Sequence, residues 1–269
     1  MTMQNISQSV PRLARRETGF HESNRDVPEE VPVAMSYNGT THAVMMATPN
    51  DLEDFAVGFS LTEGIISNIS EIEDLRIEIF EKGIDVQIRL AVQPGDALAA
   101  RRRFMAGPVG CGLCGIDSID QALRPLSALS ADSLRFKSGS IIAAMGALGG
   151  SQKLNAETRA VHGAGFYIPG EGLFAVREDV GRHNALDKLI GAMARADRPA
   201  EKGLVAITSR VSVEMVQKAV ILGVPLLAAI SAPTALAIRT ADETNLTLVA
   251  LVRGDDFDVY AHPERIVSE

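Results

Sequence analysis

The chain has 269 residues, of which 46% are hydrophobic and 22% are charged, which is enough apolar material for one large domain or two modest ones. The formal net charge of −8 at pH 7 argues against a general nucleic-acid-binding protein. Two cysteines are too few for a disulfide framework, and the first 20 residues lack the apolar stretch of a signal peptide. We therefore expect a cytoplasmic protein with no nucleic-acid partner.

The sequence also lacks a candidate membrane span. Its longest apolar run, residues 219–230, is interrupted by Gly223 and Pro225, and it is much shorter than the roughly 20 residues that a spanning helix needs. We therefore expect no membrane partner.

The N-terminal part predicts an arm followed by a small α+β unit. Residues 1–27 mix charges of both signs with little periodicity, and we expect a flexible arm there. Residues 28–106 carry two hairpin signals, an Asn-Gly pair at 38–39 and a Lys-Gly pair at 82–83. A helical pattern follows each hairpin, and the second pattern contains three consecutive arginines at 101–103.

Residues 117–269 predict an α/β domain. Helical patterns at 117–124 and 139–156 precede a hairpin that turns at Pro169-Gly170. Short apolar strands then alternate with helices, in the order β-α-β-α-β-α-β, up to the strand "LTLVALV". Because strands that are apolar throughout are buried on both faces, we expect a largely parallel sheet covered by helices on both sides, in three layers.

Several polar residues are expected at one edge of this sheet. In open parallel sheets, ligands bind at the carboxyl ends of the strands, where helix N-termini offer N–H donors to anions. The residues that we expect there, and that suit a phosphate or nucleotide, are Gly181, His183, Arg210, Ser231 and Arg253. Each type also has a structural alternative: serine as a helix N-cap, arginine in a solvated ion pair, and histidine bonded to a backbone carbonyl.

The two cysteines, Cys111 and Cys114, lie in the glycine-rich stretch "GPVGCGLCGID". A structural zinc site would need two more ligands from elsewhere in the chain. The zinc deaminase signature has proline directly before C-x-x-C, whereas Pro108 stands three residues before Cys111, and no H-x-E precedes the pair. A thioredoxin-type dithiol would lie at a strand-to-helix turn early in its domain, and inert cysteines would need larger neighbours to bury them.

A reactive thiol that carries sulfur fits this stretch best. The glycines let successive backbone N–H groups converge on a thiolate, and the arginines at 101–103 would lower the pKa of the thiol. A loop poor in side chains can also reach into the active site of another protein. We therefore predict a mobile loop at residues 107–116 with Cys111 and Cys114 as its reactive groups and with no tightly held metal. The residues alone leave zinc, redox and inert roles open.

Six stretches resemble the FdhD/NarQ family of formate dehydrogenase accessory proteins, from about residue 29 to the end of the chain. They are "EEVPVAMSYNG", "DLEDFAVGFSLTEGII", "GCGLCG", "EDVGRHNALDKLIG", "TSRVSVEMVQKA" and "NLTLVALVRGDDFDVYAHPERI", in the family's order and spacing. The resemblance implies a sulfurtransferase that accepts sulfane sulfur from a cysteine desulfurase. It would pass the sulfur to the bis-molybdopterin guanine dinucleotide form of the molybdenum cofactor, which formate dehydrogenase then receives.

The resemblance also implies a fold and a set of site residues. The family's C-terminal region is similar to the cytidine deaminase fold. Cys111 matches the cysteine that forms the persulfide intermediate, and Cys114 matches the second thiol of the pair. The family's cofactor-contacting stretch falls on Leu251, Val252, Arg253, Gly254, Asp255 and Asp256. The sequence departs from the family at this point, because two acids follow Arg253 where other members are more basic.

The remaining expectations concern the ligand and the assembly. GDP is the expected mimic of the cofactor, because an aspartate can accept hydrogen bonds from a guanine base and Arg210, Ser231 and His183 suit its phosphates. The alternative function is a non-catalytic chaperone that only holds the molybdenum cofactor and escorts it to formate dehydrogenase. We further expect a homodimer.

Overall fold

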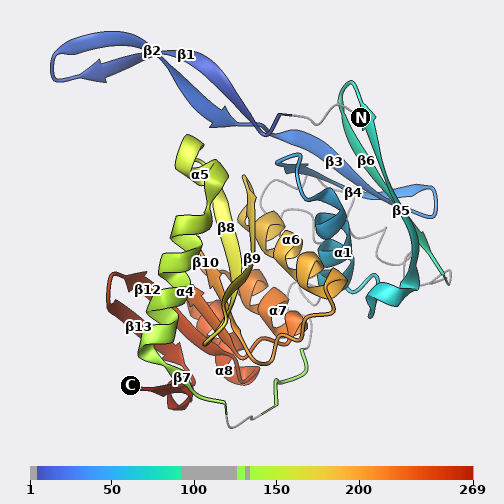
Figure 1. Cartoon of the computed structure of the whole chain (residues 1–269). Helices are drawn as coiled ribbons and strands as arrows, with labels where there is room; N and C mark the ends of the chain where they lie inside the picture. Colours follow the sequence, from blue (N-terminus) through green and yellow to red (C-terminus); the bar gives the residue numbers. More distant parts are fainter. Residues whose placement is uncertain (1–4, 92–125, 131–133, 269) are drawn as a thin grey trace.

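The computed structural model describes residues 5–91, 126–130 and 134–268. These residues form a mixed α/β fold with one sheet of six strands, one of four strands and two of two strands. Figure 1 shows the six-stranded sheet in the C-terminal part, the four-stranded sheet beside it and a long hairpin that projects from the body. Within the described ranges, no helix is long and apolar enough to cross a membrane.

The four-stranded sheet confirms both hairpins that the sequence predicts for the N-terminal unit. Its order is β4-β3-β6-β5, with two antiparallel hairpins joined by a parallel β3–β6 pair. Alternate residues of β3 face helix α1 and share a core with Phe55 and Phe59 of that helix. The elements are β3 (Val31–Tyr37), β4 (Thr40–Ala47), α1 (Leu52–Thr62), η1 (Ile69–Glu71), β5 (Ile72–Phe80) and β6 (Gly83–Leu90).

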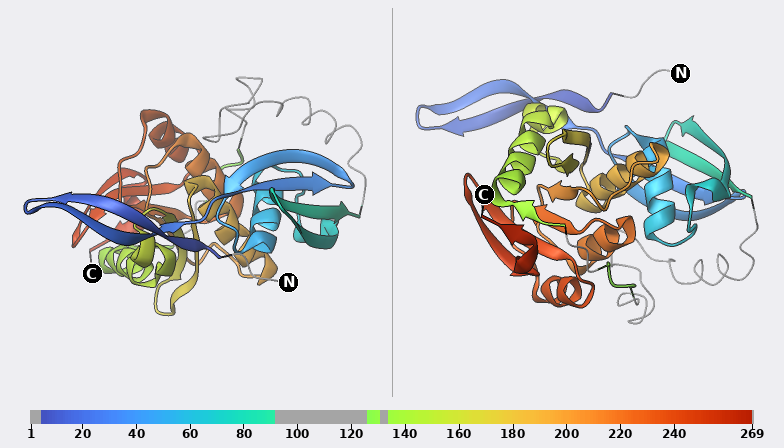
Figure 2. Two further views of the ribbon diagram at one scale, coloured as in Figure 1. Left: turned by 90° about the horizontal axis from the view of Figure 1, so that it is seen from above. Right: turned by 60° about the horizontal axis from the view of Figure 1, so that its bottom comes forward.

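The first hairpin replaces the flexible arm that we predicted for residues 1–27. Strands β1 (Ser7–Arg16) and β2 (Gly19–Pro28) pair antiparallel along their whole length. Figure 2 shows from two further sides that this hairpin extends beyond the rest of the fold. The apolar alternation of a buried strand is absent because most of the hairpin is exposed, with Leu13 and Phe20 63% and 68% exposed. Its contact with the body includes Arg25, whose guanidinium donates to the carbonyl of Thr158 of helix α5 (Lys153–Thr158) at 3.0 Å.

The six-stranded sheet is more mixed than the largely parallel sheet that we predicted. Its order is β13-β12-β11-β10-β8-β9, in which only the pairs β10–β11 and β11–β12 are parallel. Strand β8 lies antiparallel between β9 and β10, and β13 lies antiparallel at the edge beyond β12. The strands are β8 (His162–Ile168), β9 (Gly172–Asp179), β10 (Leu204–Ile207), β11 (Leu226–Ala229), β12 (Thr247–Arg253) and β13 (Asp256–Ala261).

Helices cover both faces of this sheet, which confirms the predicted three layers. On one face, residues of α6 (Arg182–Arg195), α7 (Val213–Leu222) and α8 (Ala235–Glu243) share a core with alternate strand residues such as Val205 and Ile207. On the other face, α4 (Ser138–Ser151) packs against Leu204 and Ala206. Helices α4 and α5 (Lys153–Thr158) account for the helical pattern predicted at 139–156. Short strands β7 (Phe136–Lys137) and β14 (Ile266–Val267) pair beside α4, and η2 (Pro263–Arg265) precedes β14.

The two units meet where α1 crosses α6. A Cβ atom on Gly58 of α1 would lie 1.8 Å from the carbonyl oxygen of Asp187, and one on Gly191 of α6 would lie 1.8 Å from that of Asp54. The two backbones are therefore in direct contact at this crossing. The boundary that we predicted between the units, around residues 106–117, lies outside the described residues.

Candidate functional site

The predicted sulfur-carrying residues lie outside the described part of the chain. Cys111, Cys114, the loop at 107–116, the arginines at 101–103 and the helix at 117–124 all fall there. The structure therefore addresses the other half of the prediction, the ligand site at the carboxyl edge of the sheet.

Strands β9 to β12 all run in the same direction, so their carboxyl ends share one edge of the sheet. The loops after β10 and β11 are joined there: Val211 pairs with Pro233, and the Val211 N–H donates to the carbonyl of Ala232 at 3.2 Å. These loops carry Arg210 and Ser231, which the structure thus places on adjacent loops, with Arg210 exposed. Arg210 and Ser231 therefore lie on the same edge of the sheet, as the strand pattern predicts.

Ser231 is not a helix cap, which was its structural alternative. Helix α8 is capped by Thr234, whose hydroxyl accepts from the N–H of Ala237 at 3.2 Å. Ser231 is half-buried and stands three residues before that cap.

Gly181 and His183 stand at the start of α6, as predicted. Gly181 is the N-cap residue, and its N–H donates to Asp179 at 2.7 Å. A Cβ at this position would lie 2.8 Å from the side-chain nitrogen of Asn184, so the turn accommodates glycine best. Nε2 of His183 lies 2.8 Å from the carboxylate of Glu214 in the first turn of α7. This contact brings the N-termini of α6 and α7 together and replaces the backbone carbonyl that was the alternative partner of His183.

The stretch 251–256 comprises the end of β12, a turn at Gly254 and Asp255, and the start of β13. Leu251 and Gly254 have φ values of 56° and 60°, and Arg253 pairs with Asp256 across the turn. Arg253, Gly254, Asp255 and Asp256 are exposed, and Leu251 is half-buried. Val252 is 3% exposed and its side chain packs in the core under α4, so only its backbone could contact a ligand.

The predicted residues therefore form two groups rather than one. His183 follows β9, whereas Arg253 ends β12, four strand spacings away, which is about 19 Å at about 4.8 Å a strand. Arg210 and Ser231 lie between them on the loops after β10 and β11. A ligand that touched all four would have to extend along the whole edge, as a dinucleotide can.

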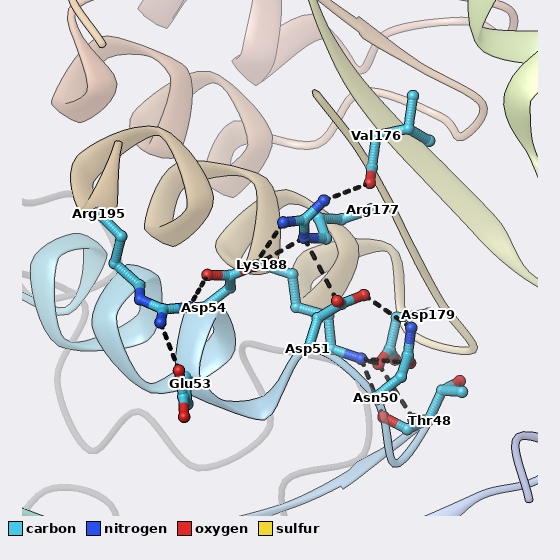
Figure 3. Close-up of polar contacts among 10 residues, drawn as sticks. All are labelled: Thr48, Asn50, Asp51, Glu53, Asp54, Val176, Arg177, Asp179, Lys188 and Arg195. Carbon is cyan, nitrogen blue, oxygen red and sulfur yellow. Dashed lines mark hydrogen bonds and ion pairs between the residues drawn. The ribbon is translucent and has the colours of Figure 1, made fainter. Parts of the chain in front are cut away.

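A buried ionic network lies beneath the Gly181 turn, and the sequence analysis missed it. Figure 3 shows Lys188 of α6 pointing toward Asp179 and the chain after β4. Its ammonium group lies 2.7 Å from Asp179, 2.9 Å from the carbonyl of Thr48 and 3.2 Å from the side-chain oxygen of Asn50. Both charged side chains are fully buried, and burial lowers the pKa of Lys188. Because Asp179 also accepts from Gly181 and Asn184, this network fixes the turn that carries His183.

The network continues between the two units. Arg177 of β9 and Arg195 of α6 both contact the buried carboxylate of Asp54 of α1, each at 2.6 Å, and Arg195 also contacts Glu53 (Figure 3). The sequence analysis did not predict these contacts. They join α1 to the α/β part through a shared acid.

A second buried cluster joins α1, α6 and α7. The ammonium of Lys218 lies 2.8 Å from Asp187, which also accepts from the hydroxyl of Thr62 at 2.7 Å. Burial raises the pKa of Asp187, and the nearby Lys218 opposes that shift. The sequence signal for both clusters is the Asp-Lys pair between Leu186 and Leu189, where charged residues stand within an apolar helix face.

His162 at the start of β8 lies close to the carboxyl edge. Its imidazole is partly buried, and burial together with the nearby charge of Arg182 lowers its pKa. His162 is therefore a neutral ring beside the first turn of α6 at neutral pH.

Comparisons with known proteins show the family of the chain. The sequence model of the FdhD/NarQ family matches residues 28–267. The chain is 70% identical over 268 residues to the sulfur carrier protein FdhD of Brucella abortus biovar 1 (strain 9-941), and 100% of both chains is covered. It is 62% identical over 258 residues to the protein of the same name from Agrobacterium fabrum, covering 96% of this chain and 95% of that relative.

A solved structure shows the same fold. The crystal structure of a protein described as a formate dehydrogenase accessory protein, from Desulfotalea psychrophila, superposes with a TM-score of 0.75 at 26% identity. The match covers 98% of this chain and 100% of that one. On the evidence of the family match and these relatives, the chain belongs to the FdhD/NarQ family.

Proposed function

We propose that this protein is a sulfur carrier in the maturation of formate dehydrogenase. The observation that carries the proposal is the 70% identity, over the full length of both chains, to a protein named sulfur carrier protein FdhD. The predicted reactive residues are Cys111 and Cys114, the only two cysteines of the chain.

The chemistry is thiol–persulfide exchange. The thiolate of Cys111 attacks the outer sulfur of a persulfide on a cysteine desulfurase, the S–S bond of the donor breaks, and the donor leaves as a thiolate. Cys111 then carries the outer sulfur as its own persulfide, with no net oxidation or reduction. Attack by the Cys114 thiol on Cys111 would release that sulfur as sulfide and leave a disulfide, which a cellular dithiol then reduces.

The acceptor in this proposal is the bis-molybdopterin guanine dinucleotide form of the molybdenum cofactor, bound as a substrate. Support comes from the carboxyl edge, where Arg210, Ser231 and Arg253 line successive strand ends and can serve a long polyanionic ligand. Asp255 and Asp256 are exposed beside Arg253 and can accept from a guanine base. Calorimetry with GDP tests this assignment: Arg210→Ala and Arg253→Ala should each weaken binding about tenfold. Equal affinities would remove both residues from the site.

The cellular setting in the proposal is the cytoplasm, with a cysteine desulfurase as donor and formate dehydrogenase as client, and with a homodimeric carrier. The likeness of the C-terminal part to the cytidine deaminase fold belongs to the same proposal. The three layers and the meeting of the α6 and α7 N-termini at the sheet edge support it.

Intact-protein mass spectrometry tests the carrier function. After incubation with a cysteine desulfurase and cysteine, the protein should gain about 32 Da, the mass of one sulfur atom, mapped to Cys111. Cys111→Ser should abolish the gain, and Cys114→Ser should still be loaded. A protein that binds GDP but never gains sulfur would be a non-catalytic cofactor chaperone. A reversible loss of two hydrogens without a gain of sulfur would indicate a dithiol oxidoreductase.

A further inference from the structure

The projecting β1–β2 hairpin carries a row of arginines on one of its two faces. Arg12 and Arg16 are four positions apart in β1, and Arg25 of β2 pairs directly with Val10. Alternate residues of a strand share a face, and so do directly paired residues of two antiparallel strands. The three arginines therefore lie in one row about 20 Å long, at about 3.4 Å a residue. The acidic residues of the two strands lie on the opposite face.

Within the described residues, the polar contacts of Arg12 and Arg16 are with the hairpin itself. Nε of Arg12 donates to the hydroxyl of Ser23 at 3.1 Å, and Arg16 donates to the carbonyl of Arg15 at 3.0 Å. These contacts hold the two side chains in place but neutralise neither charge. The row therefore suits a partner with a negatively charged surface.

The opposite face of the hairpin carries its two most exposed apolar side chains. Leu13 pairs with Glu22, and Phe20 pairs with Arg15, whose guanidinium lies 6.0 Å from the centre of the Phe20 ring. Covering a leucine or phenylalanine side chain contributes about 1.5–3 kcal/mol. A flat surface such as a membrane can cover one face of a hairpin, whereas a groove in a protein covers both. The net charge of −8 disfavours a nucleic acid as the partner.

The hairpin is attached to the body beside the carboxyl edge of the six-stranded sheet. Glu178, near the end of β9, accepts from the N–H groups of Leu154 and Asn155 in the first turn of α5, both at 2.9 Å. At the other end of α5, the carbonyl of Thr158 accepts from Arg25 of the hairpin at 3.0 Å. Figure 1 shows the hairpin passing α5 and extending away from the sheet. A protein that contacts the hairpin would therefore lie next to that edge.

We propose that the β1–β2 hairpin is a docking arm for the protein that receives the cofactor, and that it enters a groove with one acidic and one apolar wall on that protein. Arg12 and Arg16 face the acidic wall, and Leu13 and Phe20 face the apolar wall. Residues 7–27 lie before the stretch that the family model matches, so the arm is separate from the features that define the family. In naming formate dehydrogenase as the recipient, the inference rests on the proposed function.

Binding of the full-length protein to purified, cofactor-free formate dehydrogenase, measured by biolayer interferometry, tests the arm. The double variant Arg12→Glu, Arg16→Glu should bind at least about tenfold more weakly, because like charges would then meet. The double variant Leu13→Ser, Phe20→Ser should also lose at least about tenfold, because the apolar wall would stay uncovered. Added salt should weaken the wild type more than the variant that lacks the two arginines.

The β5–β6 hairpin supplies matched controls. Arg76→Glu, Arg89→Glu changes the net charge equally, and Ile79→Ser, Phe80→Ser removes side chains that are 45% and 56% exposed. Both should bind formate dehydrogenase like the wild type, and circular dichroism checks that every variant is folded.

The proposal is overturned if the wild type does not bind formate dehydrogenase, or if the β1–β2 variants bind it as well as the controls do. It is also overturned if analytical ultracentrifugation shows that these variants convert a dimer into a monomer at unchanged affinity for formate dehydrogenase, because the arm would then contact a second copy of the chain. The mass gain at Cys111 should be the same in all variants. Since it is measured without formate dehydrogenase, a failed docking arm and a failed sulfur carrier give different results.

Discussion

Lys188 is the residue whose surroundings are least expected from its type. Its ammonium is fully buried, yet Asp179, the carbonyl of Thr48 and the side chain of Asn50 all lie within 3.2 Å of it. Three acceptors match the three N–H donors of an ammonium, so burial leaves none of them unsatisfied. Such a pair contributes little net stability while intact, but removal of one partner leaves an uncompensated charge in the interior.

Lys188→Met should therefore destabilise the protein by about 3–5 kcal/mol, because Asp179 would remain buried without its cation. Urea denaturation measures the change. Arg76→Met is the control: Arg76 also pairs with an aspartate, at 2.8 Å, but its side chain is 71% exposed, so its loss should cost less than about 1 kcal/mol. Similar losses in the two variants would show that Lys188 has no special role.

The lowered pKa of His162 leads to a prediction of how the free energy of unfolding depends on pH. Because burial and Arg182 lower its pKa in the folded protein, the unfolded chain binds the proton more tightly. Stability is then highest above the unfolded pKa of about 6.5 and falls as the pH drops below it, until the folded ring is also protonated. The loss of stability between pH 7.5 and pH 5.5 should be smaller in His162→Gln than in the wild type, as urea midpoints would show.

Among the elements, the packing of α1 against α6 depends on two glycines. The helices touch at Gly58 and Gly191, where a Cβ would overlap the backbone of the other helix. Backbone atoms cannot rotate away as a flexible side chain can, so any larger residue must push the helices apart. The same crossing aligns Asp54 with Arg177 and Arg195, and thus sets the distance between the units.

Gly58→Ala and Gly191→Ala should each destabilise the protein by at least about 1–3 kcal/mol through overpacking, even though alanine favours helices. Gly146→Ala in α4 is the matched control, since a Cβ there meets nothing within 4 Å. It should stabilise the protein by up to about 1 kcal/mol. Thermal unfolding measures all three, and a neutral Gly58→Ala would mean that the crossing is looser than the structure shows.

The whole molecule is built around a helix that two cores share. Phe55 and Phe59 of α1 pack in the core of the four-stranded sheet, while Asp54, Gly58 and Thr62 of the same helix contact the α/β part. Neither core is complete without α1. The β1–β2 hairpin is the opposite case, because most of its residues are exposed and a two-stranded hairpin is only marginally stable by itself.

Hydrogen exchange should therefore show that the two larger sheets unfold together and that the β1–β2 hairpin is much less stable. Amides of β3 and β6 should open with the same free energy as those of β10 and β11, because both sheets lose their packing when α1 leaves. Amides of β1 and β2 should exchange at least about 100-fold faster. Two distinct free energies for the two sheets would show that the units fold independently.

The candidate site was predictable where the signal is local. Gly181 and His183 follow from a turn between a strand and a helix, and Arg210 follows from the end of an apolar strand. The contact between His183 and Glu214 was missed, because no spacing in the chain relates the starts of α6 and α7. The burial of the Val252 side chain could not be read from the family motif, because a motif does not show which of its side chains point into the core.

The sequence by itself determined the two hairpins and the first helix of the four-stranded unit, the three layers of the C-terminal part and the family, since apolar periodicity, turn residues and motifs are local properties. Only the tertiary structure decided the antiparallel insertion of β8, the partners of Lys188 and Asp54, and the meeting of the α6 and α7 N-termini. Thr48 and Lys188 are 140 residues apart in the chain. Contacts at such separations depend on how the units pack, and packing is set by the shape of all the side chains together.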